Sequence, residues 1–290
     1  MADHRHAGHG DGWDWEARGA RLEREGEIGL PWIEAAAEWV ASLAVPAPVQ
    51  TILDVGSGPG VAACVLAGRF PSARVTAVDG TAALLDRATA RAGRAGLGDR
   101  VGTLCADLGG DLSVLPEAEI IWAARVLHHL PDQAHGLRDL AGRLRPAGLL
   151  VAVEGGLSPR FLPGECGVGD PGLFSRLDAA MSQAVASRLH HTTWEAPRPV
   201  YDWPVQLAAA GLTPHPSRSF LLDLPAPVDP HVREYLFERL RDARSMAEEY
   251  LAADDLAALD RLLDPADPLS VAHRPDLFLL SVSTVHIGRR

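Results

Sequence analysis

The sequence contains no lysine, and all 27 of its basic residues are arginine. Against them stand 38 acidic residues, so the 290-residue chain carries a formal charge of −11 at pH 7. Proteins that bind DNA or RNA draw most of their affinity from basic contacts with phosphates. An acidic surface is a poor match for such a partner, and we therefore expect no nucleic-acid binding.

Cysteine is also scarce. Cys64, Cys105 and Cys166 are too few and too scattered to form a disulfide framework or a zinc site. No stretch approaches the ~18 unbroken apolar residues of a membrane span, and the N-terminus lacks the apolar core of a signal peptide. We therefore expect a reduced, cytoplasmic protein that binds no membrane and carries no metal ion. Its length suits one large α/β domain with insertions, or two small domains.

The most informative stretch is residues 52–60, Ile-Leu-Asp-Val-Gly-Ser-Gly-Pro-Gly. A strand-forming run leads into three alternating glycines, and a helix-like apolar pattern follows. Strand, glycine turn and helix together bring the backbone close to a nucleotide-like ligand. The spacing differs from the dinucleotide pattern G-x-G-x-x-G, because the third glycine is at 60 rather than 61. Asp54, inside the strand, would repel a pyrophosphate but would suit a sulfonium cofactor with a free ammonium group. The alternative is an ordinary strand–helix turn.

Two further acidic residues follow predicted strands. The strand 74–79 ends in Asp79, where a carboxylate can accept hydrogen bonds from two ribose hydroxyls. The strand 101–105 leads to Asp107 and Leu108. Asp107 could accept from an adenine amine while Leu108 packs on the ring, or Asp107 could be an ordinary loop aspartate. These positions indicate a nucleoside site at the carboxyl ends of the strands.

The fourth predicted strand, 119–124, continues into Arg-Val-Leu-His-His-Leu-Pro-Asp at 125–132. A helix, the sequence Leu-Arg-Pro-Ala-Gly ending at 148, and a fifth strand at 149–153 come next. Together with the glycine turn and Asp79, this run resembles the class I S-adenosylmethionine (SAM)-dependent methyltransferases. The resemblance covers about residues 50–155.

The resemblance implies an α/β fold with a Rossmann-like, seven-stranded, mostly parallel sheet and helices on both faces. We expect the last two strands at 217–224 and 276–287. Insertions after strands five and six would form a helical cap above the carboxyl ends, where open α/β sheets bind ligands. The expected domains are an N-terminal tail and helical lid at 1–48 and a methyltransferase domain at 49–290. The cap insertions fall at about 155–202 and 229–263.

The resemblance also implies SAM as the cofactor and assigns its binding to residues of these motifs. They are Asp54, Gly56, Ser57, Gly58, Gly60, Asp79, Gly80, Asp107, Leu108 and Arg125. Contacts with the acceptor substrate would come from the lid, the loop after strand four and the first insertion. The candidates are Trp15, His129, His190, His191 and Tyr201. Trp15 could instead cover an edge of the sheet.

His128 is the first candidate for a general base. In the plant-type small-molecule O-methyltransferases the base is a histidine in a His-Asp-x-x-Asp run after strand four. The sequence around His128 is similar, with His129 in place of the usual aspartate. The large N-terminal dimerisation domain of those enzymes is missing. His128 could alternatively shape the cofactor loop without removing a proton, and His190, His191 or Tyr201 could be the base.

These features predict a SAM-dependent methyltransferase that acts on a small organic molecule such as a secondary metabolite, with O-methylation favoured over N- or C-methylation. The Asn-Pro-Pro-Tyr type of signature found in amino-group methyltransferases of DNA or protein is missing after strand four. Two alternatives stay open: a SAM-fold protein that catalyses another step, such as a cyclisation, and a non-catalytic partner subunit. The oligomeric state is also open, with a homodimer among the candidates.

Overall fold

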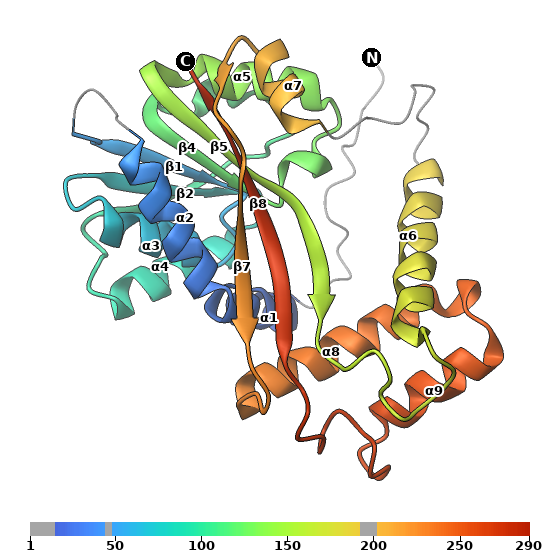
Figure 1. Ribbon diagram of the computed structural model, residues 1–290. Helices are drawn as coiled ribbons and strands as arrows, with labels where there is room; N and C mark the ends of the chain where they lie inside the picture. Colours follow the sequence, from blue (N-terminus) through green and yellow to red (C-terminus); the bar gives the residue numbers. More distant parts are fainter. Residues whose placement is uncertain (1–14, 44–47, 192–201) are drawn as a thin grey trace, which may run out of the picture. The chain divides into compact units, whose positions relative to one another are not determined.

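The computed structural model describes residues 15–43, 48–191 and 202–290 (Figure 1). The chain divides into two compact units. Unit 1 comprises Met1–Gly156, Asp202–Phe220 and Ser283–Arg290, and unit 2 comprises Leu157–Tyr201 and Leu221–Val282. Among the described helices, none combines the length and the apolar character that a membrane span requires.

An α/β sheet forms the centre of unit 1. Its strand order is β3-β2-β1-β4-β5-β8-β6, with β7 paired to β8. The pairs β1–β2, β2–β3, β1–β4 and β4–β5 are parallel, and β6–β8 is antiparallel. The strands are β1 (Thr51–Val55), β2 (Arg74–Asp79), β3 (Val101–Cys105), β4 (Ala118–Ala124), β5 (Leu144–Arg160), β6 (Thr213–Pro214), β7 (Arg218–Leu224) and β8 (Leu279–Arg289).

This order reverses direction between β1 and β4, because the chain first builds β2 and β3 on one side of β1 and then crosses to the other. Open α/β sheets bind ligands at such a switch point, outside the carboxyl ends of the strands. The glycine turn after β1 and the loop after β4 both lie there. The topology therefore brings together the motifs that the sequence singles out.

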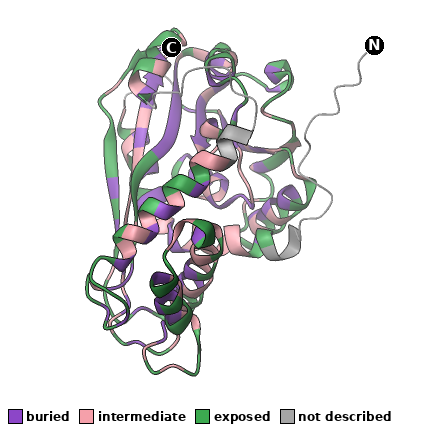
Figure 2. Ribbon diagram, turned by 90° about the vertical axis from the view of Figure 1, so that its right-hand side faces the viewer, coloured by how far each residue is buried: buried purple, intermediate pink, exposed green. Residues whose placement is uncertain are grey.

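Helices cover both faces of this sheet (Figure 1). Leu53, Val55 and Ile121 face the buried cluster formed with α5 and α7. Ile52 and Trp122, at alternate positions, face the side that carries α2, α3 and α4. The central strands β1 and β4 are mainly buried, whereas the helices also have many exposed positions (Figure 2). The helices of unit 1 are α1 (Trp15–Ile28), α2 (Leu30–Ser42), α3 (Val61–Arg69), α4 (Ala82–Arg94), α5 (Gln133–Gly142) and α7 (Trp203–Ala209).

Unit 2 is mainly helical. Its helices are α6 (Leu173–His191), α8 (Pro230–Ala247) and α9 (Ala253–Leu263). All three fall within the insertions at about 155–202 and 229–263, which the sequence predicts to be helical. α8 contacts both α6 and α9. Arg176 on α6 also binds Asp255 on α9 through two nitrogens, at 2.8 Å and 2.6 Å. Asp255 is buried, so this bidentate pair holds the two helices together.

The structure corrects three details of the sequence-based fold. The sheet has eight strands rather than seven, since Thr213–Pro214 adds a short strand beside β8. Two residues are too few to leave a periodic pattern. The helical lid expected within residues 1–48 is two helices in its described part, broken at Gly29, because Pro31 in the first turn of α2 cannot continue a preceding helix.

The third correction concerns β5. The sequence predicts the fifth strand at 149–153, yet the strand runs from Leu144 to Arg160. Ala147, Gly155 and Gly156 have φ values of 65°, 75° and 115°. These local bends, two of them at glycines that adopt positive φ readily, let the strand change direction without ending.

Charged residues attach α1 to α4. The Glu23 carboxylate lies 3.0 Å from Arg87, 2.8 Å from Arg91 and 2.9 Å from Arg94. Its side chain is only 16% exposed. Glu27 on α1 also pairs with Arg91. A single, largely buried carboxylate therefore pairs with three guanidinium groups, of which those of Arg87 and Arg91 are themselves partly buried.

We predict that Glu23→Gln lowers the free energy of unfolding of unit 1 by about 1–3 kcal/mol, because partly buried guanidinium groups lose their shared counter-ion. The matched control is Glu38→Gln. Glu38 pairs with Arg69 at 2.6 Å, but its side chain is 67% exposed, so we expect a loss below about 1 kcal/mol. Urea unfolding followed by tryptophan fluorescence measures both, since six of the seven tryptophans fall within unit 1. Equal losses in the two variants would contradict the prediction.

Candidate functional site

The glycine turn after β1 is shaped by positive φ angles and by a close approach. Gly56 and Gly58 have φ values of 67° and 52°. A Cβ atom on Gly56 would lie 2.5 Å from Cγ2 of Val126, so only glycine lets this turn lie against the loop after β4. A Cβ on Gly58 would meet no described atom within 4 Å. The turn therefore borders open space at the switch point of the sheet, where a ligand can approach the backbone.

Asp79 connects the end of β2 to this turn. Its Oδ2 accepts from the backbone N–H of Gly58 at 2.9 Å, and its Oδ1 accepts from that of Thr81 at 2.9 Å. Each carboxylate oxygen can accept more than one hydrogen bond. The Asp79 side chain can therefore shape the turn and still accept from two ribose hydroxyls.

Asp54 is a buried carboxyl group with an incomplete set of partners. It is 2% exposed, and its Oδ2 has no hydrogen-bond partner among the described residues. Burial raises the pKa of Asp54 to about 7, and the charge of Asp79 adds to the rise, whereas a hydrogen bond from the Ala63 backbone opposes it. A buried polar atom without a partner is costly. An ammonium group of a bound cofactor would supply the missing partner, so the residues present fit SAM.

The other predicted cofactor residues are less specific. Asp107 is exposed on the loop after β3, and its Oδ1 accepts from the Gly109 backbone at 2.9 Å. Leu108 is half-buried and packs on the core cluster. The hydroxyl of Ser57 is buried and has no partner among the described residues. A Cβ on Gly80 would make only an ordinary contact of 3.8 Å, so sterics do not require glycine there.

His128 lies in a short 3₁₀ turn, Leu127–His129, directly after the β4 loop. Its Nδ1 is 2.8 Å from Oε2 of Glu154. The other carboxylate oxygen, Oε1, accepts from the backbone N–H groups of Val126 and Leu127 at 3.0 Å and 2.8 Å. Glu154 is only 4% exposed, whereas the His128 side chain is 37% exposed. A buried, fully bonded carboxylate therefore orients an accessible imidazole.

This geometry determines which ring nitrogen of His128 can act. A carboxylate can only accept, so Nδ1 carries the hydrogen and Nε2 keeps the lone pair. A histidine oriented in this way by an acid is the arrangement of a general base. Glu154 is a site residue that the sequence motifs do not predict. The available signal was its position at the end of a predicted strand, which is also the position of Asp79.

Arg125 makes contacts that the sequence does not predict. It has a positive φ of 54°, which is uncommon for a residue with a side chain. Its guanidinium pairs with Glu25 of α1 and lies 5.9 Å from the ring centre of Trp32 of α2. The Arg125 side chain is thus directed at α1 and α2. Gly26 of α1 also approaches α3 closely, because a Cβ there would lie 2.7 Å from Val61.

The predicted substrate-binding residues have different outcomes. His129 is exposed, and its ring centre lies 4.0 Å from that of His128. The side chains of Trp15, His190 and His191, and all of Tyr201, lie outside the described residues. Their roles stay predictions.

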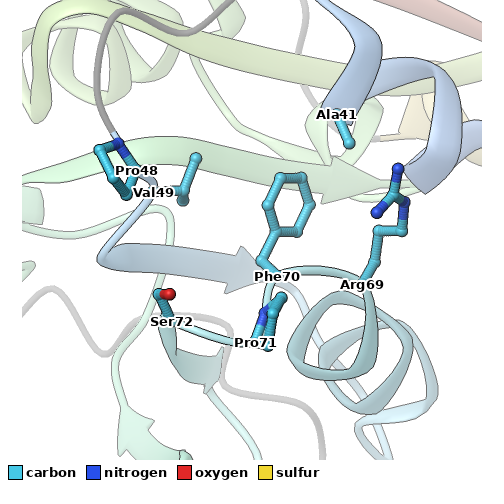
Figure 3. A pocket seen from close by; sticks show the side chains of 7 residues that line it. All are labelled: Ala41, Pro48, Val49, Arg69, Phe70, Pro71 and Ser72. Carbon is cyan, nitrogen blue, oxygen red and sulfur yellow. The ribbon is translucent and has the colours of Figure 1, made fainter.

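A separate hollow of about 300 Å³ lies near the start of β1 (Figure 3). Its lining residues are Ala41, Pro48, Val49, Arg69, Phe70, Pro71 and Ser72. It lies at the end of β1 opposite to the glycine turn, and Arg69 is already paired with Glu38. We therefore do not assign chemistry to it. Within the described ranges, no group of three His, Cys, Asp or Glu side chains is arranged to hold a metal ion.

Comparisons with known proteins agree with this geometry. Residues 52–148 match a family model described as a methyltransferase domain. A trans-aconitate 2-methyltransferase of Methylobacterium radiotolerans is 33% identical over 162 residues, 51% of this chain and 58% of that protein. An acetylserotonin O-methyltransferase of Mus musculus is 37% identical over 117 residues, 39% of this chain and 30% of that protein.

The fold has counterparts among solved structures. The YcgJ protein of Bacillus subtilis superposes with a TM-score of 0.51 at 16% identity, covering 88% of this chain and 98% of that one. This likeness concerns the fold. The chain spans 58% and 30% of the two curated relatives, so those matches concern the domain rather than the whole proteins. For residues 52–148, the family model, the sheet order and the glycine turn agree on a SAM-dependent methyltransferase domain with a Rossmann-like fold.

Proposed function

We propose that the protein transfers a methyl group from SAM to an oxygen atom of a small organic molecule, with His128 as general base. The observation that carries the proposal is the 2.8 Å contact between His128 Nδ1 and Glu154 Oε2. A base is needed when the attacking atom holds a proton tightly, as a hydroxyl does. The relatives named for trans-aconitate and acetylserotonin support a small organic acceptor.

The cofactor would bind along the carboxyl ends of β1, β2 and β3. Asp54 would pair with its ammonium group, Asp79 with its ribose hydroxyls and Asp107 with its adenine amine. The glycine turn would contact it through the backbone. SAM supplies a methyl group already activated by the sulfonium, so most of the remaining work for the protein is positioning and exclusion of water.

His128 would remove the acceptor's proton at Nε2, the nitrogen that keeps a lone pair. The resulting imidazolium is stabilised by the negative charge of Glu154, which is held in place by two backbone N–H groups. The second histidine, His129, would line the acceptor side of the same turn. The expectation that segments 155–202 and 229–263 close over the acceptor stays a prediction.

The first test of the cofactor site uses Asp79. Asp79→Ala should weaken SAM binding at least about tenfold, because hydrogen bonds to a charged acceptor are worth about 1.5–3 kcal/mol each. Asp86→Ala is the matched control, since this aspartate is exposed on α4. Isothermal titration calorimetry measures both affinities. An unchanged affinity in folded Asp79→Ala protein would reject the assignment.

The second test follows from the raised pKa of Asp54, about 7 in the free protein. Below pH 7 this carboxyl is mainly neutral, whereas an ammonium partner favours its charged form, so binding should release a proton there. We expect SAM to bind about tenfold more weakly at pH 6 than at pH 8. Calorimetry at pH 6 in two buffers of different ionisation enthalpy measures the released proton. Asp54→Asn should abolish this release; release that persists in the variant would contradict the role of Asp54.

The third test addresses the base. His128→Ala should lower kcat by about 10²–10⁴ while SAM affinity changes little. Glu154→Gln should lower kcat too and move the acidic limb of the pH–rate profile to lower pH, because the charge that stabilises the imidazolium is lost. Transfer of labelled methyl from SAM is measured on a panel containing trans-aconitate, N-acetylserotonin and simple phenols.

The control for this test is His135→Ala, on α5, where the exposed imidazole lies 3.2 Å from Asp139. We expect this variant to keep the wild-type rate. If His128→Ala keeps full rate but binds SAM poorly, His128 supports the cofactor loop and is not the base.

A further inference from the structure

Two pairs of polar side chains link the segment 217–219, at the start of β7, to β8. The hydroxyl of Ser217 lies 2.7 Å from Nδ1 of His286, and the hydroxyl of Ser219 lies 3.0 Å from that of Thr284. All four residues belong to unit 1. The two pairs are alike in position, but one of them makes an additional contact.

That contact joins His286 to Glu154. The second ring nitrogen, Nε2, lies 3.3 Å from the main-chain carbonyl oxygen of Glu154. A carbonyl can only accept, so Nε2 carries the hydrogen, and Nδ1 then accepts from the Ser217 hydroxyl. Burial lowers the pKa of His286, although the Glu154 backbone contact and the charges of Glu154 and Asp202 act in the opposite direction. Both contacts therefore suit a neutral imidazole with one defined tautomer.

The contact falls on a bend in β5. The last register pair between β4 and β5 is Ala124 with Val153. The two residues after Glu154, Gly155 and Gly156, have positive φ values and no side chains that could pack. Glu154 is therefore the point where β5 leaves β4 and bends, and His286 holds its carbonyl from the neighbouring strand β8.

We propose that His286 is a positioning residue for the reaction. Together with Ser217 it fixes the main chain of Glu154, so that the Glu154 carboxylate meets Nδ1 of His128 with the correct distance and direction. The link runs from β8 through the Glu154 backbone to the carboxylate and then to the base. It rests on the proposed role of His128 and assigns a further residue to the same site.

Three variants separate positioning from general support of the sheet. His286→Ala removes the contact with Glu154. His286→Gln keeps an amide N–H that can donate to the same carbonyl. Thr284→Val removes the hydrogen bond between Thr284 and Ser219. This pair links the same two segments but is not the one that contacts Glu154, so the variant controls for the loss of a polar link between them.

The direct readout is the pH titration of the His128 imidazole, followed by NMR in the cofactor-free protein. A less well aligned carboxylate stabilises the imidazolium less. We therefore expect the titration midpoint to move to lower pH by at least about 0.3 unit in His286→Ala. We expect no shift in Thr284→Val and a largely restored midpoint in His286→Gln. On the acceptor panel, kcat should fall about three- to thirtyfold in His286→Ala, with SAM affinity unchanged.

Three outcomes would overturn the inference: an unmoved His128 midpoint in His286→Ala, an equal shift in Thr284→Val, or an equal shift in His286→Gln. If His286→Ala does not fold, Ser217→Ala takes its place, because it removes the partner of Nδ1 and should shift the midpoint in the same direction. Full activity of His128→Ala would reject the proposed function, yet the NMR titration would still decide whether His286 positions Glu154.

Discussion

The arrangement of the site depends on one buried negative charge. Removing a carboxylate from water costs several kcal/mol unless its oxygens are bonded, and Glu154 is 4% exposed. Its two oxygens are bonded to the backbone N–H groups of Val126 and Leu127 and to the imidazole of His128. The loop after β4 must therefore curl towards Glu154 to supply these donors. The position of His128 follows from the need to supply hydrogen bonds to the buried Glu154 carboxylate.

Asp54, a second buried acid on the same side of the sheet, lacks the full set of hydrogen bonds that Glu154 has. Asp54 keeps an oxygen without a partner among the described residues, and burial raises its pKa to about 7. Asp79 lies between these extremes, because it accepts two backbone N–H groups and remains half-exposed. The three acids Glu154 of β5, Asp54 of β1 and Asp79 of β2 thus differ in how many of their hydrogen bonds the protein itself supplies. The least satisfied one marks the place for a positively charged ligand group.

Local features of the site could be predicted from the sequence, whereas contacts across the sheet could not. The glycine turn after β1 and the acid at the end of β2 each depend on a few consecutive residues. The Glu154–His128 contact joins residues 26 positions apart, and the His286–Glu154 contact joins residues 132 positions apart. The length of β5 escaped prediction for a related reason, since glycines that favour a loop locally are held in the strand by neighbouring strands.

Arg125 shows how backbone conformation sets the direction of a side chain. Its φ of 54° accompanies a guanidinium that pairs with Glu25 and lies over Trp32, while the cofactor contact expected from its sequence position stays a prediction. A left-handed conformation costs an L-residue about 1–2 kcal/mol, and it persists only where the surroundings support it. Here the support comes from α1 and α2, which precede the sheet in the chain. The loop that carries His128 is therefore held by Glu154 of β5 on one side and by α1 and α2 on the other. Its geometry depends on contacts with parts of the chain that lie far from it in the sequence.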